Sequence, residues 1–211
     1  MRRNFQSKGK GMKKIPTLFI RDFAQDDGEY VTGYVTVGCE WVMRGEGRPT
    51  RKYDGTCVQI DNDGDVWTRR EVRRGAKTPP SFIEVEHDNI TGKTVGWIPY
   101  EQSPFAWFIV EALNQRDHPY YISGTYELCG PKINKNPDGF ATHKLIRHKD
   151  APLVPFLYDA PYVYGTVYNV VTKMHQHYNY EGIVWHHPDG RMAKIKFKDL
   201  RPNQNYEVLA L

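Results

Sequence analysis

The tetrapeptide Lys52-Tyr53-Asp54-Gly55 holds the residues best suited to chemistry. A lysine amine acts as a nucleophile once it has lost its proton, which burial or neighbouring cations promote. We expect the tetrapeptide to open a β-strand, so that Asp54 lies on the same side as Lys52 and Gly55 allows close backbone approach. Lys52 could then reach a phosphorus atom. The same four residues also suit a plain turn with a solvated lysine, so the motif needs support from elsewhere in the chain.

Four further segments with charged side chains follow in order. They are Trp67-Thr68-Arg69-Arg70, Tyr126-Glu127-Leu128-Cys129-Gly130, Glu181-Gly182-Ile183-Val184-Trp185 and Ala193-Lys194-Ile195-Lys196. Taken singly, each segment also suits an ordinary strand, in which Glu127 and Glu181 would be surface carboxylates. The alternate residues Lys194, Lys196 and Lys198 similarly suit the solvated face of an edge strand. Only the joint occurrence of these segments favours a catalytic site.

This order of segments resembles the covalent lysine nucleotidyltransferase superfamily of DNA ligases, RNA ligases and mRNA capping enzymes. The longer stretches 14–17, 126–137 and 181–186 are similar to the small stand-alone 5′–3′ RNA ligase family, and the resemblance extends from about Lys13 to Leu200. It implies an antiparallel-sheet nucleotidyltransferase core of the ATP-grasp-like ligase type with packed helices. No OB domain is expected, since only fifteen residues follow Lys196.

The resemblance also implies a role for each matching residue. Lys52 is expected to attack the α-phosphate of ATP and form a phosphoramidate with AMP. A divalent cation is expected at Glu181. The implied nucleotide-binding residues are Asp54, Gly55, Arg69, Glu127, Val184, Lys194 and Lys196.

Within that set, each side chain suits its assigned part of the nucleotide. Arg69, preferred to Arg70, offers a planar fork to phosphate, and Glu127 can accept hydrogen bonds from ribose hydroxyls. Val184 or Ile183 is expected to cover one face of the adenine. Lys194 and Lys196 alternate along a strand, so both can neutralise the α-phosphate. The residue that stacks on the base is not assigned; the interval that should hold it contains Phe140, His143, His148 and Phe156.

The implied activity is that of an ATP-dependent RNA ligase. It would join a 5′-phosphate to a 3′-hydroxyl through lysyl-AMP and an adenylated 5′ end, with ATP and Mg²⁺, or alternatively Mn²⁺, as cofactors. A DNA nick ligase and a GTP-dependent capping-type enzyme are alternatives with the same chemistry. A non-catalytic RNA-binding module is the alternative from another class.

Local patterns predict the elements that position these residues. We expect strands over residues 30–37, 56–60, 66–72, 120–129, 181–187 and 192–197, with hairpin turns at 61–65 and 188–190. Ser103 and Pro104 predict a helix over 104–116, and Asp159 is expected to cap a second helix that runs to about His175. Hairpins with two helices indicate an α+β fold built on antiparallel sheets.

The organisation of the chain is expected to be simple. Residues 1–14 are predicted to form a flexible basic arm, and residues 15–211 a single nucleotidyltransferase (adenylation) domain. The pairs His175/His177 and His186/His187 lack the spacing of a metal site, so hydrogen-bonded or solvated histidines are favoured. Three cysteines without CxxC spacing fit a reducing compartment.

Composition bounds the class of protein. Hydrophobic residues make up 39% and charged residues 26% of 211, as in globular proteins and unlike disordered ones. The net charge of +4 tolerates a polyanionic partner without demanding one. No apolar run is long enough for a bilayer. We expect a soluble, cytoplasmic protein, with a monomer favoured and RNA rather than a membrane as its partner.

Overall fold

The computed structural model describes residues 12–23, 30–89, 91–115, 121–155, 157, 161–202 and 204. The chain divides into two compact units. Unit 1 contains Met1–Lys14 and Gly55–Asp150, and unit 2 contains Ile15–Asp54 and Ala151–Leu211. The predicted single domain over 15–211 stays a prediction, and most of the predicted basic arm lies outside the described residues.

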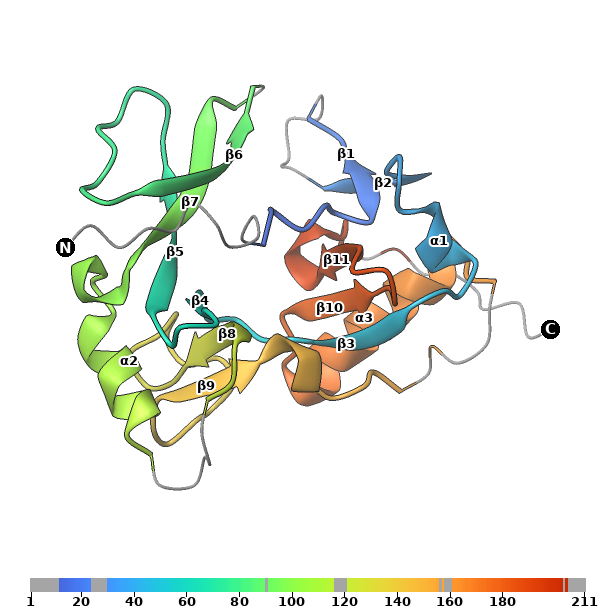
Figure 1. Cartoon of the computed structure of the whole chain (residues 1–211). Coiled ribbons are helices and arrows are strands. Elements are labelled where there is room, and N and C mark those ends of the chain that lie inside the picture. Colours follow the sequence, from blue (N-terminus) through green and yellow to red (C-terminus); the bar gives the residue numbers. More distant parts are fainter. Residues whose placement is uncertain are drawn as a thin grey trace. The chain divides into compact units, whose positions relative to one another are not determined.

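Unit 1 is built on one antiparallel sheet of six strands in the order β6-β7-β5-β4-β8-β9 (Figure 1). The strands are β4 (Thr56–Ile60), β5 (Val66–Val72), β6 (Ile83–Asp88), β7 (Lys93–Pro99), β8 (Gly124–Cys129) and β9 (Lys144–Arg147). The bounds of β4 and β5 confirm the predicted hairpin, whose turn closes when the Asp61 amide donates to the Asp65 carbonyl. The predicted strand 120–129 begins later, at Gly124, and Tyr120 lies outside the described residues.

Helix α2 (Ala106–Leu113) covers one face of this sheet. Its Ile109 and Ala112 are fully buried with Val58 and Leu128 of the strands. The helix starts two residues after the predicted Pro104, because residues 103–106, after the 3₁₀ turn η2 (Tyr100–Gln102), form a tighter turn in which the Ala106 amide donates to the Ser103 carbonyl. The Ser103 hydroxyl still accepts a hydrogen bond from the Phe105 amide. Arg116, the predicted end, lies outside the described residues.

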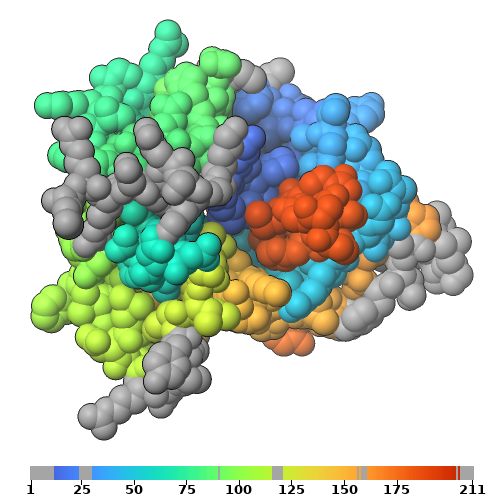
Figure 2. All heavy atoms as spheres, in the orientation of Figure 1, coloured from blue at the N-terminus to red at the C-terminus, as the bar shows by residue number. Residues whose placement is uncertain are grey.

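Unit 2 has a three-stranded antiparallel sheet in the order β11-β10-β3 and a two-stranded sheet of β1 and β2. Its elements are β1 (Phe19–Arg21), β2 (Val31–Val35), α1 (Glu40–Met43), β3 (Arg48–Lys52), α3 (Tyr164–Tyr178), β10 (Gly182–His186) and β11 (Met192–Lys196). Residue Thr17 forms a parallel bridge with Lys194 of β11. Figure 2 accordingly shows the orange-red atoms of the C-terminal part of unit 2 packed on its blue N-terminal segments.

The core of unit 2 lies between α3 and the three-stranded sheet. Val167 and Val171 of α3 are buried together with Ile183, Trp185 and Ile195 of β10 and β11. This arrangement leaves the opposite face of that sheet for polar side chains, because successive strand residues point to opposite faces.

The predicted second helix exists, but its bounds differ. Its N-cap is Val163, and it continues to Tyr178, three residues beyond the predicted His175. Asp159, the predicted cap, lies outside the described residues. Strand β3, which contains Pro49, was also not predicted. As β3 lies at the edge of its sheet, a missing backbone donor is tolerated there.

The class of fold is α+β, with mostly antiparallel sheets and few helices, as predicted. Among the described residues, no helix combines the length and apolar character that crossing a lipid bilayer requires.

Candidate active site

Three residues of unit 2 form one row across its three-stranded sheet. Gly182 of β10 pairs with Lys52 of β3 on one side and with Lys196 of β11 on the other. Residues opposite one another in a sheet point to the same face, so both lysines emerge from the same face on either side of a residue without a side chain. Lys52 therefore ends strand β3, which corrects the prediction that it opens a strand.

Glu181, immediately before β10, joins the two lysines. Lys52 Nζ donates to Glu181 Oε2 at 2.5 Å, and Lys196 Nζ donates to Glu181 Oε1 at 2.5 Å. The side chains are largely sheltered, with exposed fractions of 16% for Lys52, 11% for Glu181 and 20% for Lys196. Two ammonium groups are thus fixed by a single carboxylate, and we call these three residues the lysine–glutamate triad.

Burial and charge oppose each other at the triad carboxyl. Burial raises the pKa of Glu181, but the charges of Lys52 and Lys196 and their hydrogen bonds lower it by more. The net pKa lies below the ordinary value of 4.5, so Glu181 is ionised at neutral pH. The carboxylate thereby balances one of the two positive charges that the strands bring together.

Gly182 is required at the centre of the row. A β-carbon added there would lie 2.0 Å from the Ile195 carbonyl oxygen and 2.8 Å from the Lys196 Cα, closer than real contacts allow. Any side chain would therefore push β11 away from β10. The glycine lets the two strands approach closely, which brings Lys196 within reach of Glu181.

The same face of the sheet carries the next row, Thr50, Val184 and Lys194. Val184 is only 8% exposed, and the Thr50 hydroxyl donates to the Val184 carbonyl at 3.1 Å. Ile183 points into the core on the opposite face. Of the two residues weighed for covering the adenine, only Val184 shares a face with the lysines.

Arg51 pairs with Ile183 and so starts from the sheet face opposite the two lysines, and its guanidinium lies between two tyrosine rings. Its guanidinium carbon is 4.5 Å from the ring centroid of Tyr53 and 4.4 Å from that of Tyr180. These tyrosines are the sequence neighbours of Lys52 and Glu181. This stack was not predicted, although the two tyrosines next to Lys52 and Glu181 were a visible signal in the sequence. The stack ties together the backbones that carry the triad.

Asp54 does not lie where the sequence analysis placed it. Strand β3 ends at Lys52, and Asp54 occupies a bend before β4 begins at Thr56. The argument that Asp54 points to the same side as Lys52 because both belong to one strand is therefore wrong. The sequence pattern missed this, since a Lys-x-Asp-Gly turn and a strand start look alike.

Two other predicted residues, Gly55 and Glu127, meet in unit 1. The Gly55 amide donates to Glu127 Oε1 at 3.2 Å, and a β-carbon on Gly55 would lie 2.3 Å from the Leu128 carbonyl oxygen. Gly55 thus allows close approach to β8. His148 Nε2 lies 2.8 Å from Glu127 Oε2, and its other ring nitrogen lies 3.0 Å from the Thr125 hydroxyl. His148, weighed above as a base-stacking residue, instead orients Glu127.

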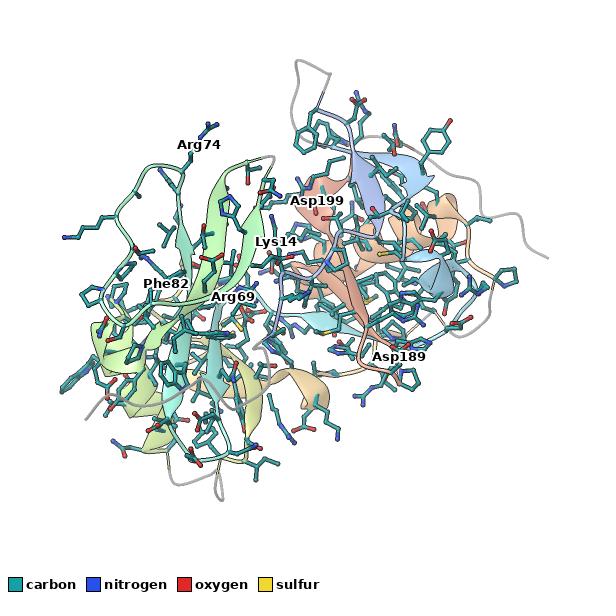
Figure 3. The ribbon with its side chains drawn as sticks, turned by 45° about the horizontal axis from the view of Figure 1, so that its top comes forward. Lys14, Arg69, Arg74, Phe82, Asp189 and Asp199 are labelled. Atoms are coloured by element: carbon teal, nitrogen blue, oxygen red, sulfur yellow. The ribbon has the colours of Figure 1, made fainter. Side chains whose placement is uncertain are left out.

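Arg69 shares the sheet face of Glu127. Cys57 pairs with Glu127, and continuing the β4–β5 register by one residue places Arg69 on the other side of Cys57. In this structure Arg69 Nη1 donates to the backbone carbonyls of Met12, at 3.0 Å, and Lys13, at 3.3 Å. Figure 3 shows Arg69 and Lys14 close to one another. Arg69 therefore holds the chain segment before β1.

Of the remaining candidates for base stacking, His143 is occupied by other contacts. His143 is 4% exposed, stacks on Phe108 at 4.4 Å between ring centroids, and bonds to Glu111. Phe140 is partly buried, and Phe156 lies outside the described residues. The base-stacking residue stays unassigned.

Three of the four histidines weighed as a metal cluster are held by hydrogen bonds, and the fourth, His177, is exposed. His175 Nδ1 lies 2.9 Å from the Tyr180 carbonyl, and its ring stacks on Phe197. His186 Nε2 lies 3.1 Å from the Thr50 hydroxyl, and His187 contacts Glu46. Hydrogen-bonded histidines were the favoured interpretation.

The described residues offer a cation few protein ligands. They contain no group of three or more His, Cys, Asp or Glu side chains suited to a metal. Both oxygens of Glu181 are bonded to ammonium groups. Magnesium in nucleotide enzymes is commonly bound by one or two carboxylates together with substrate phosphates. A cation near the triad therefore fits only as a companion of bound phosphates.

Two comparisons of the sequence with known proteins give no match. No protein-family model matches the chain, and a search of curated protein sequences finds no significant match.

Proposed function

We propose that the protein is an ATP-dependent RNA ligase that acts through a covalent lysyl-AMP intermediate on a nucleotidyltransferase core. The observation that carries the proposal is the lysine–glutamate triad. Lys52, Glu181 and Lys196 come from three separate motifs of the superfamily, 129 and 15 positions apart in the chain, and their charged atoms are in contact. A solvated turn or a solvated strand face would give no reason for this convergence.

The first step is the attack of Lys52 Nζ on the α-phosphorus of ATP. An N–P bond forms, the bond from the α-phosphorus to the bridging oxygen breaks, and pyrophosphate leaves with that oxygen. The amine must give up its proton before or during the attack. Glu181 accepts a hydrogen bond from this amine, so its carboxylate fixes the amine's position, and the proton passes to solvent because the lowered pKa of Glu181 makes it a weak base.

Lys196 and Lys194 supply positive charge to the same face. Negative charge on the non-bridging oxygens of the α-phosphate must be balanced in the transition state, and preorganised cations do this without reorganisation. The two residues are neighbours on one side of β11, and Val184 beside them offers an apolar surface to a base.

The later steps use the stored AMP. A 5′-phosphate oxygen of RNA attacks the lysyl-AMP phosphorus, the N–P bond breaks, and a 5′-adenylated RNA forms. A 3′-hydroxyl then attacks the 5′-phosphorus, the phosphodiester forms, and AMP leaves. Glu127 and Arg69 remain the proposed ligands of ribose and phosphate. Magnesium, or alternatively manganese, would be carried by the nucleotide phosphates and supply Lewis-acid charge neutralisation.

The covalent step gives the most direct test. The protein is incubated with ATP labelled at the α-phosphate and magnesium, then denatured, and retained label is measured. Wild type should retain AMP. Lys52→Ala and Lys52→Arg should retain none, because alanine has no amine and arginine stays protonated. An adduct that persists in Lys52→Ala would refute the assignment of the nucleophile.

Replacing Lys196 should slow AMP-adduct formation without abolishing it. Lys196→Ala removes one preorganised cation, a loss of roughly 2–4 kcal/mol in the transition state by analogy with oxyanion donors. Adduct formation should therefore slow by about 30-fold to 1000-fold. Lys198→Ala is the matched control, because Lys198 lies on the same segment and is exposed. Equal rates for both variants would make Lys196 a structural residue.

The choice of substrate distinguishes an RNA ligase from the other enzymes that use the same lysyl-nucleotide chemistry. Sealing of 5′-phosphorylated RNA is compared with DNA of the same sequence, with ATP or GTP as the only nucleotide. We expect ATP and RNA. Efficient sealing of all-DNA nicks would indicate a DNA ligase, and GTP-dependent transfer to a 5′-diphosphate end a capping-type enzyme. RNA binding without any adduct would indicate a non-catalytic binding module.

A further inference from the structure

One short segment of unit 1 carries a positive charge as large as that of the whole protein. Residues 69–77 hold five cations and one carboxylate, for a net charge of +4, and the complete chain also has a net charge of +4. The other residues are therefore neutral in sum. We call residues 69–77 the basic loop.

The basic loop presents most of its charge to solvent. Arg70, Arg73, Arg74 and Lys77 are all exposed, and within the described part of the chain none of them forms an ion pair or hydrogen bond through its side chain. The single carboxylate, Glu71, is paired with Lys93 at 3.2 Å. The four cations are thus available to an outside partner.

The backbone of the loop is ordered by turns. Strand β5 ends at Val72, and the Ala76 amide donates to the Arg73 carbonyl at 3.0 Å around Gly75, whose φ is +76°. The aliphatic stem of Arg74 lies against Gly92, where an added β-carbon would be 2.8 Å from the Arg74 Cδ. Figure 3 shows the Arg74 guanidinium pointing away from the ribbon. Arg74 is therefore held on a folded turn and directed outward, with the exposed Arg73 and Lys77 on the same segment.

We propose that the basic loop is the surface that binds the phosphate backbone of the RNA substrate. This inference rests on the proposed function for the identity of the polyanion. Four exposed cations within eight residues complement the charge of a polyphosphate backbone, and arginine fits phosphate oxygens with its planar fork. Phosphate contacts position a nucleic acid without reading its bases. Arg70, Arg73, Arg74 and Lys77 of the loop therefore bind RNA ends of any sequence and, unlike Arg69, take no part in lysine adenylation.

The test compares two variants with the same total charge. The loop variant carries Arg70→Ser, Arg73→Ser, Arg74→Ser and Lys77→Ser. The control variant replaces four exposed cations elsewhere with serine, namely Arg44, Lys149, Lys173 and Lys198. Binding of a fluorescent 5′-phosphorylated single-stranded RNA is measured by anisotropy across a range of salt concentrations.

Each phosphate contact contributes about 0.7 to the slope of log affinity against log salt for single strands, so the loop variant should lose about 3 in slope. Its RNA affinity at about 0.1 M salt should fall about tenfold or more. The control variant should keep wild-type slope and affinity, and the loop variant should still form the AMP adduct at the wild-type rate.

Equal weakening of RNA binding in both variants would overturn the proposal, because total charge and not the loop would then govern binding. Binding of polyglutamate by the loop as tightly as RNA of equal charge would also overturn it, since an acidic protein would then be an equal partner. If the proposed function itself were wrong, the wild-type protein would form no AMP adduct, whatever the result of the RNA-binding comparison.

Discussion

At the scale of single residues, Glu181 has the largest influence on the candidate site. A carboxylate that is 11% exposed accepts hydrogen bonds from two ammonium groups, and each of these belongs to a different strand. Removing its charge leaves two cations close together with no anion between them. Breaking a buried pair in this way usually destabilises a protein more than the pair had stabilised it.

Glu181→Gln should therefore lower the free energy of unfolding by about 3 kcal/mol at pH 7. Because the folded pKa of Glu181 is lowered below 4.5, its stabilising contribution is complete above the unfolded value. It is lost as the pH falls through the folded pKa. Urea unfolding of wild type and variant should differ at pH 7, and the difference should shrink steadily below about pH 4. A difference independent of pH would contradict the role of the charge.

The stack around Arg51 gives a second residue-scale prediction. Arg51→Lys keeps the charge but loses the planar group between two rings, so stability should fall by about 1–2 kcal/mol. AMP-adduct formation should slow as well, because the stack holds the neighbours of Lys52 and Glu181. Tyr180→Phe keeps the ring and serves as the control. A loss in Tyr180→Phe equal to that in Arg51→Lys would show that the phenol hydroxyl, and not the stack, matters.

At the scale of elements, the β10–β11 hairpin decides where the lysines lie. Its register pairs Gly182 with Lys196 and Val184 with Lys194. A shift of one residue would turn both lysines into the core beneath α3. The apolar face of the hairpin, Ile183 with Ile195, fixes the register because it must stay buried.

Gly182→Ala should disrupt this element. The added methyl group would overlap the Ile195 carbonyl oxygen, so we expect a loss of about 2–4 kcal/mol in unfolding free energy and of AMP-adduct formation. Gly33→Ala in β2 is the matched control, since its nearest neighbour would be Tyr164 at an ordinary 3.8 Å. Thermal unfolding of the two variants provides the measurement. Similar midpoints would mean that β10 and β11 separate without cost.

At the scale of the whole molecule, the chain builds two cores. One contains Val58, Ile109 and Leu128 of unit 1, and the other contains Met174 and Trp185 of unit 2. Among the described residues, each core draws on residues of its own unit, although each unit is assembled from separate parts of the sequence.

Cavities in the two cores should have local effects. Leu128→Ala in unit 1 and Met174→Ala in unit 2 each remove a fully buried side chain and should cost about 2–5 kcal/mol. Hydrogen exchange should show the loss of amide protection concentrated in the unit that carries the substitution. Equal loss of protection in both units for either variant would show that the chain unfolds as one cooperative body.

The sequence by itself determined the elements whose signals are local. The Asp61–Asp65 turn, the β4 and β5 strands and the β10–β11 hairpin follow from turn residues and alternation, which act over a few positions. The same alternation correctly put Lys194 and Lys196 on one face. The order of charged motifs also identified Lys52, Glu181 and Lys196 before any geometry was known, because each motif is a short stretch of neighbouring residues.

Only the tertiary structure decided how those motifs meet. The end of β3 at Lys52 depends on pairing with β10, and the position of Asp54 in a bend depends on where β4 begins. The contacts of Glu181 with both lysines, the Arg51 stack and the link from His148 to Glu127 join residues far apart in the chain. Such contacts are set by strand register and by which face each core buries. These are properties of packing between distant segments, which no local pattern encodes.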